Sequence, residues 1–170
     1  MVLFGSGCQK KGVVRPQGVQ PFVPVHVEFK GLRKDVSVEK EIAQRLFCTD
    51  CLFIRADTPP QPYTLIVHYD RRMDLKSLGL VVLSAALAPV EAEFTYTLQV
   101  EVLENDKVLK EYVYTGQTLE ETDSAYGSMF NPFHDANGRS EEIFAALTDH
   151  FLREVMIDKP VPQVVSSNTE

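Results

Sequence analysis

The clearest pattern in the chain is an alternation of apolar and polar positions within Glu91–Thr118. The apolar positions are Phe94, Tyr96, Leu98, Val100 and Val102, and the polar ones between them are Thr95, Thr97, Gln99 and Glu101. This two-residue period is typical of a strand with one buried face. Turn-forming residues follow at Glu104–Lys107, and the β-branched and aromatic run Val108–Thr115 returns. The pattern predicts a long β-hairpin.

Two segments with a helical period flank the central strands. In the first, Val38, Ile42 and Leu46 recur every fourth residue, which predicts a helix that starts at a cap on Asp35 or Ser37 and ends near Phe47. In the second, Ser140-Glu141-Glu142 would cap a helix that Pro160 and Pro162 stop. Its apolar face is formed by Ile143, Phe144, Leu147, Phe151 and Val155.

Three shorter runs are typical of strands: Val25–Phe29, Leu52–Ile54 and Tyr63–Tyr69. Strands in the middle of the chain with two helices predict an α+β fold, a two-layer sandwich of a mainly antiparallel sheet with both helices on one face. We expect a single globular domain over residues 25–158. A flexible Pro- and Gly-containing linker over 9–24 would precede it, and a disordered tail over 159–170 would follow it.

The first eight residues resemble the end of a lipoprotein signal peptide. Ser6 and Gly7 are the small residues expected before a lipidated cysteine, here Cys8. Gly5 departs from the usual Leu or Val, and Met1–Gly7 lacks the basic start of a signal peptide. The resemblance implies that Cys8 carries a lipid anchor, which with more than one acyl chain holds a protein stably on a membrane. The alternative is a free cysteine in a disordered N-terminus.

Composition narrows the classes of partner. The net charge is −7, which argues against a nucleic-acid partner, since that would need a basic stripe or patch. Basic residues cluster locally at Lys10-Lys11, Lys30–Lys34 and Arg71-Arg72. The longest apolar run, Leu78–Val90, has about 13 residues, fewer than the ~20 that span a bilayer.

Cys48 and Cys51 form the most obvious chemical motif, Cys-Thr-Asp-Cys. A redox pair places its reactive cysteine at a helix N-terminus, where the helix dipole lowers the thiolate pKa. Here the pair follows a predicted helix C-terminus, which opposes a thiolate, and Asp50 adds negative charge. We therefore expect a structural disulfide in an oxidising compartment, with free or metal-bound thiols and redox catalysis as alternatives.

Other catalytic signatures are weak. The histidines His26, His68, His134 and His150 have no metal-ligand spacing, and no nucleotide-binding or nucleophile-elbow motif occurs. We expect no catalytic residue, no metal site and no cofactor. The rival hypotheses are a thiol oxidoreductase that uses Cys48 and Cys51, or a hydrolase that uses His134.

Two apolar segments, Leu78–Val90 and Tyr126–Phe133, are candidates for an interaction surface. If both lie at one end of the sandwich, they would form a patch suited to a partner protein or to lipid. The candidate residues are Leu80, Val81, Val82, Leu83, Met129, Phe130 and Phe133. The alternatives are that both segments complete the core, or that Leu78–Val90 and the sheet hold a lipid or other apolar ligand.

The element order, together with the phrase Tyr96–Lys107 (Tyr-Thr-Leu-Gln-Val-Glu-Val-Leu-Glu-Asn-Asp-Lys), resembles small Gram-negative envelope lipoproteins. Examples are the lipopolysaccharide-assembly lipoprotein of the outer-membrane translocon and the auxiliary lipoproteins of envelope ABC transporters. The resemblance implies a non-enzymatic protein that contacts an envelope protein partner. Gln9 after the cysteine favours the periplasmic face of the outer membrane, with the inner membrane as the alternative.

Overall fold

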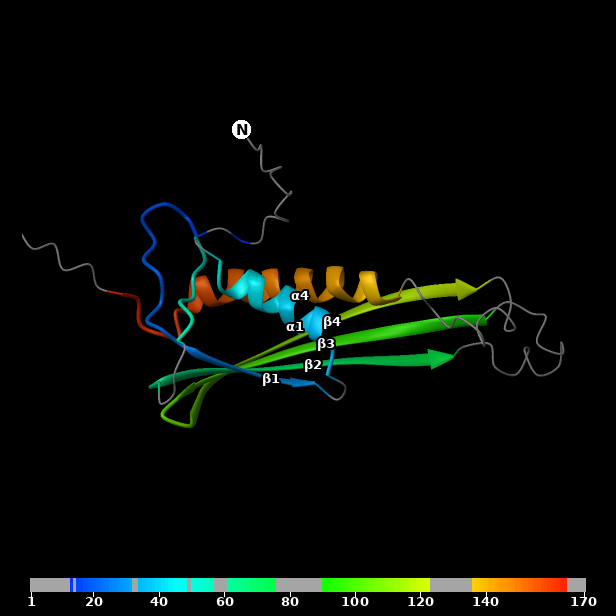
Figure 1. Cartoon of the computed structure of the whole chain (residues 1–170), viewed down its shortest axis with the longest axis horizontal. Coiled ribbons are helices and arrows are strands. Elements are labelled where there is room, and N and C mark those ends of the chain that lie inside the picture. Colours follow the sequence, from blue (N-terminus) through cyan, green and yellow to red (C-terminus); the bar gives the residue numbers. More distant parts are fainter. Residues whose placement is uncertain are drawn as a thin grey trace, which may run out of the picture.

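The computed structural model describes residues 13, 15–31, 34–48, 50–56, 61–75, 90–122 and 136–164. In chain order, its elements are β1 (His26–Gly31), α1 (Val36–Leu46), β2 (Tyr63–Leu75), β3 (Val90–Glu104), β4 (Lys107–Thr122) and α4 (Ala136–Asp158). Both helices cover one face of the sheet (Figure 1), and no described element covers the other face, which we call the open face. The predicted α+β two-layer sandwich is confirmed.

The sheet has the strand order β1-β2-β3-β4. β1 pairs with β2 in parallel, and the two other pairs are antiparallel. Asn105 and Asp106 connect β3 to β4 with φ angles of 48° and 66°. Positive φ at both central residues is what a tight type I′ hairpin turn requires. The predicted hairpin is therefore confirmed.

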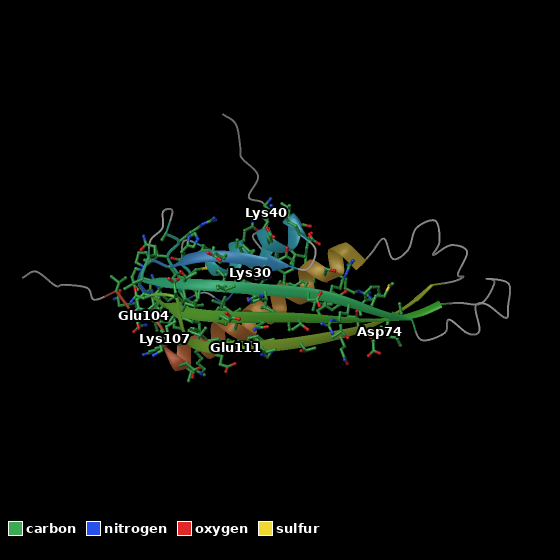
Figure 2. The ribbon with its side chains drawn as sticks, turned by 90° about the horizontal axis from the view of Figure 1, so that it is seen from below. Lys30, Lys40, Asp74, Glu104, Lys107 and Glu111 are labelled. Carbon is green, nitrogen blue, oxygen red and sulfur yellow. A yellow bond between two sulfur atoms is a disulfide. The ribbon has the colours of Figure 1, made fainter. Side chains whose placement is uncertain are left out.

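We call the end of the sheet at this turn the proximal end and the end where β2 stops at Leu75 the distal end. Figure 2, which views the open face, shows Glu104 and Lys107 near the proximal end and Asp74 near the distal end. β1 pairs with β2 only from Thr64 to Tyr69. Beyond Tyr69, β2 has β3 as its one neighbouring strand among the described residues. The sheet is thus four strands wide proximally and three strands wide distally.

The core lies between the sheet and the two helices. The five alternating apolar residues predicted to be buried on β3 are each 0–2% exposed. From α1, Val38, Ile42 and Leu46 point into the same core, as their spacing predicts. Arg45 Nη1 of α1 lies 2.7 Å from Asp149 Oδ2 of α4, which joins the two helices at their surface.

The cap of α1 is Asp35. Its Oδ1 accepts hydrogen bonds from the backbone N–H groups of Ser37 and Val38 at 3.1 and 3.2 Å. These bonds satisfy two of the amides that a helix start leaves unpaired. The prediction left the cap open between Asp35 and Ser37, and the structure assigns it to Asp35.

The structure places the start of α4 earlier than predicted. The helix begins at Ala136, four residues before the expected cap at Ser140. Asn137 and Gly138 are poor helix formers, so the sequence pattern indicates a later start. Ser140 is instead buried in the helix at 1% exposure, and its Oγ accepts a hydrogen bond from Arg71 on β2.

The predicted strand Leu52–Ile54 is also wrong. Leu52 and Phe53 are both buried, at 1% and 2% exposure, so the segment lacks the alternation of a strand with one buried face. The segment is held by single hydrogen bonds: the Phe22 N–H donates to the Leu52 carbonyl at 2.8 Å, and the Val25 N–H to the Ile54 carbonyl at 2.9 Å.

The packed domain extends beyond both expected boundaries. Phe22, in the segment expected to be a linker, is fully buried, with its ring centroid 5.1 Å from that of Phe53. Val161, in the segment expected to be a disordered tail, is 1% exposed. The Val23 N–H donates to the Pro162 carbonyl at 2.9 Å. The two segments therefore close the proximal end together. Among the described helices, none combines the length and hydrophobicity of a membrane span.

Candidate functional site

A groove opens on the helix side of the sheet where the helices end and the strands continue. Its volume is about 600 Å³, within the ~300–1,000 Å³ typical of small-molecule sites. We call it the distal groove. It is lined by Lys34, Asp35, Val38, Tyr69, Asp70, Arg71, Arg72, Met73, Phe94, Ser140 and Phe144.

The distal groove exists because the helix-facing side of β2 changes character along its length. Leu65 and Val67 are fully buried, whereas Met73 on the same side is 47% exposed. Between them, Arg71 Nη1 donates a hydrogen bond to Ser140 Oγ at 3.0 Å. Its guanidinium carbon lies 5.7 Å from the centroid of the Phe94 ring, close enough for a cation–π interaction. A cation is thus held against an aromatic floor.

Tyr69 marks the boundary between the packed core and the groove. Its hydroxyl accepts a hydrogen bond from the Asp35 N–H at 3.0 Å and donates to Glu39 Oε1 at 2.7 Å. Burial, followed by the bond and charge of Glu39, raises the pKa of Tyr69 to about 12. The hydroxyl stays protonated at physiological pH and fixes the start of α1 to β2, so its role here is structural.

The charges in the groove suit recognition better than catalysis. Lys34 and Arg71 are basic, and Asp35 caps α1. Asp70 and Arg72 alternate with Arg71 along β2 and belong to the open face, where Asp70 Oδ2 lies 3.0 Å from Arg72 Nε. No pair of groove side chains has the nucleophile–base arrangement of covalent catalysis. Across the described part of the chain, no cluster of three or more His, Cys, Asp or Glu side chains could hold a metal ion. The groove can offer positive charge, hydrogen-bond donors and apolar contact.

The open face carries a second polar cluster where β1 ends. Gln99 Nε2 donates to Glu101 Oε1 at 3.2 Å and to Glu111 Oε1 at 3.0 Å. His68 Nε2 lies 3.3 Å from Glu101 Oε1, without the geometry of a hydrogen bond, so the contact is an ion pair only when the histidine is protonated. The adjoining hollow of about 330 Å³ is smaller than the distal groove.

The predicted cysteine pair comes together as a disulfide. Cys48 and Cys51 are bonded with a Cα–Cα distance of 4.9 Å, directly after α1 and at the proximal end. Cys51 is 4% exposed. The bridge is therefore part of the packing that supports α1, and it lies at the opposite end of the domain from the distal groove.

Several predicted residues lie outside the part of the chain that the structure describes. They are Cys8, Leu80, Val81, Val82, Leu83, Met129, Phe130, Phe133 and His134. The strand ends next to the two apolar segments are described: Leu75 pairs with Ala92, and Val90 pairs with Thr122. These described strand ends lie at the distal end of the sheet, and the shared surface of the two segments stays a prediction.

The sequence did not identify the distal groove. The basic clusters around Lys34 and Arg71-Arg72 were visible, but nothing local joins them to each other or to Ser140. One sequence feature that could have indicated the groove is Asp70–Met73, where two arginines interrupt the apolar alternation of β2. A helix-facing Arg at the position where a core residue is expected indicates the end of the covered sheet.

Comparisons with known proteins identify the fold. No family model and no curated protein matches the chain. Among solved structures, it is similar to a minor lipoprotein from Acinetobacter baumannii, with a TM-score of 0.51 and 13% identity over 85% of this chain and 99% of that one.

Two further structures overlap less well. A protein from Xanthomonas campestris has a TM-score of 0.46 and 14% identity over 87% of this chain and 96% of that one. Rare lipoprotein B from Shewanella oneidensis has a TM-score of 0.42 and 10% identity over 79% and 96%. The likeness to the Acinetobacter protein shows that the chain shares its fold.

Proposed function

We propose that the chain is a membrane-anchored lipoprotein of the bacterial envelope that acts through contacts with an envelope protein, in assembly, transport or maintenance, and without enzymatic activity. The anchor is Cys8, and the membrane is the outer membrane at its periplasmic face. The observation that carries the proposal is the separation of two ends: the N-terminal segment joins the domain proximally, and the distal groove lies at the other end.

Distances support this separation. The Arg15 N–H donates to the Asp50 carbonyl at 3.0 Å, which holds the start of the described chain next to Cys51 of the disulfide. In Figure 1, this blue segment lies at the proximal end. Cys8 lies only five residues before Val13, a reach of at most about 18 Å. β3 alone has 15 residues, which is about 50 Å of strand. A lipid on Cys8 would therefore hold the proximal end near the membrane, and the distal end could extend toward a partner.

The anchor is tested by detergent phase partitioning of the full chain from cells that export it. We expect the protein in the detergent phase and the Cys8→Ser variant in the aqueous phase. A Cys48→Ser, Cys51→Ser variant is the matched control, because it removes cysteines without touching the anchor, and should partition as the unchanged protein. Equal partitioning of the Cys8→Ser variant and the unchanged protein would contradict the anchor.

The contact surface is tested separately with a photo-crosslinking residue in place of Met73, which lines the distal groove. The control position is Ile157, which is 81% exposed at the proximal end of α4. We expect a discrete protein adduct from position 73 and none from position 157. Adducts of the same size from both positions would contradict a distal contact surface.

A second candidate function is supported by the volume of the distal groove and by its apolar floor of Val38, Phe94 and Phe144. A groove of this size can hold a lipid or other apolar ligand. Native mass spectrometry of the purified chain tests this carrier function. A bound small molecule that Phe144→Ala removes would favour it, and ligand-free protein from every preparation would contradict it.

A further inference from the structure

β4 is an edge strand of the described sheet. It has 16 residues and pairs with β3 on one side. Among the described residues, no backbone group outside the sheet bonds to its other side. Proteins normally protect long edges with charges, prolines or covering elements, because free strand edges pair with other chains.

The distal part of this edge lacks that protection. The seven residues Val113–Leu119 (Val-Tyr-Thr-Gly-Gln-Thr-Leu) carry no charge and no proline, although the chain as a whole has a net charge of −7. On the open face, Val113 and Leu119 are 56% and 63% exposed. The nearest charged residues along the strand are Glu111, labelled in Figure 2, and Glu120. An uncharged, β-prone edge with exposed apolar side chains is suited to pairing with another strand.

We propose that this edge pairs with the same edge of a second copy of the chain, antiparallel and about a two-fold axis at Gly116. In this register, Val113 of each copy lies opposite Leu119 of the other, and Thr115 lies opposite Gln117. Moving the axis by one residue in either direction would place Glu121 opposite Val113 or Glu111 opposite Leu119. The register at Gly116 alone among these three joins apolar side chains to each other on the open face.

The helix layer fits the same arrangement. α4 contacts both β3 and β4, so it lies over the line between them. With strands about 4.8 Å apart, each α4 would lie about one strand spacing from the two-fold axis. The two copies of α4 would then be about 10 Å apart, a normal distance for packed helices.

The side of α4 toward this edge carries His150, whose ring centroid is 6.2 Å from that of Tyr114. One turn earlier on this side is the exposed Ala146, which is small enough for the close approach of a second helix.

The packing of α4 on β4 explains why position 116, at the two-fold axis, is a glycine. A Cβ at this position would lie 3.1 Å from the Cγ2 atom of Ile143 on α4. The glycine lets α4 approach β4 closely, and it leaves no side chain on the strand at the two-fold axis.

The test is the mass of the full chain in solution, measured by light scattering or sedimentation over a range from micromolar to submillimolar concentration. The Cys8→Ser background removes both the acyl group and any disulfide through Cys8. We expect a monomer–dimer equilibrium that Leu119→Lys weakens by about tenfold or more. Val36→Lys is the matched control, because Val36 is 66% exposed and the change in charge is the same; it should leave the equilibrium unchanged.

Cross-linking tests the register. In the same background, a mixture of Thr115→Cys and Gln117→Cys chains should form a covalent dimer on mild oxidation, and neither variant should do so alone. A monomer at every concentration would overturn the proposal and favour a strand from another protein as the occupant. A dimer that Leu119→Lys leaves intact, or cross-links from either single variant alone, would also overturn it.

Discussion

β2 passes through two environments, and the difference between them explains the organisation of the domain. From Thr64 to Tyr69 it has a strand on each side, and its helix-facing side chains Leu65 and Val67 are fully buried. From Asp70 to Leu75 it pairs with β3 alone, and Met73 is 47% exposed. The proximal half of β2 therefore belongs to the packed core, and its distal half lies at the surface.

On β2, the segment from Leu65 to Tyr69 contributes to the core, and the segment from Asp70 to Asp74 is placed where it can make contacts. A charged group that would be costly to bury in a core, such as Arg71 beside Phe94, is tolerated where the helices stop. Substitutions in the proximal core should therefore affect stability strongly, and substitutions of the exposed distal residues of β2 should affect it weakly.

The largest effect is expected from Phe151→Ala. Phe151 is fully buried, and its ring lies 6.0 Å from Phe53 and 5.2 Å from Tyr112, between centroids. The cavity should lower the free energy of unfolding by about 3–5 kcal/mol, measured by urea denaturation. Met73→Ala is the distal counterpart and should cost less than about 1 kcal/mol. Similar losses of unfolding free energy in the two variants would contradict the difference between the proximal and distal halves.

Gly31→Ala tests the boundary between the halves. A Cβ at Gly31 would lie 2.5 Å from Cζ of Tyr69, whose ring is held by the bonds to Asp35 and Glu39. The clash should lower the free energy of unfolding by about 1–3 kcal/mol. Gly18→Ala is a control for loss of a glycine with open space, since no atom lies within 4 Å of its Cβ position, although its φ of +86° adds strain of its own. If Gly31→Ala is neutral, Tyr69 is not fixed at the boundary.

The disulfide should have a smaller effect because its loop is short. Replacing Cys48 and Cys51 with serine should lower the free energy of unfolding by about 2 kcal/mol, as the entropy of a four-residue loop implies. Thiol titration of the Cys8→Ser variant, with and without denaturant, should find no free thiol. Two free thiols in this variant, isolated without reductant, would contradict the bridge.

The smallest effect is a dependence of stability on alkaline pH. The pKa of Tyr69 is raised from 10.0 to about 12, and burial also raises the pKa values of Tyr112 and Tyr114. Because the folded state holds these protons more tightly than the unfolded state, their contribution is complete below pH 10 and is lost as the pH rises toward 12. Urea unfolding should show falling stability over this window, and Tyr69→Phe should reduce the slope. An unchanged slope would exclude Tyr69 as its source.

The sequence predicted those parts of the fold that local periodicity determines. The alternation at Phe94–Val102 correctly indicated the hairpin, and the fourfold spacing of Val38, Ile42 and Leu46 indicated α1. Where consecutive residues are both buried, as at Leu52 and Phe53, periodicity indicated a strand that does not form. At Asn137 and Gly138, weak helix propensity concealed the first turn of α4.

The distal groove could not be predicted in the same way. It depends on Lys34, Arg71 and Ser140, which are far apart in the sequence and meet only because β2 extends beyond the helices. The free edge at Val113–Leu119 likewise depends on strand order, which the alternation of side chains does not specify. Sequence patterns predict which face of each helix or strand is buried. The site depends instead on how far each element extends past its neighbours, which these patterns do not specify.

Hydrogen exchange along β2 tests most directly the claim that one strand is divided between core and surface. Backbone amides from Leu65 to Tyr69 should exchange only through global unfolding, because β1 and β3 flank them and the helices cover them. Amides from Asp70 to Asp74 should include fast-exchanging positions, since alternate N–H groups point away from β3. Uniform protection across residues 65–74 would contradict the division and with it the account of a distal contact surface.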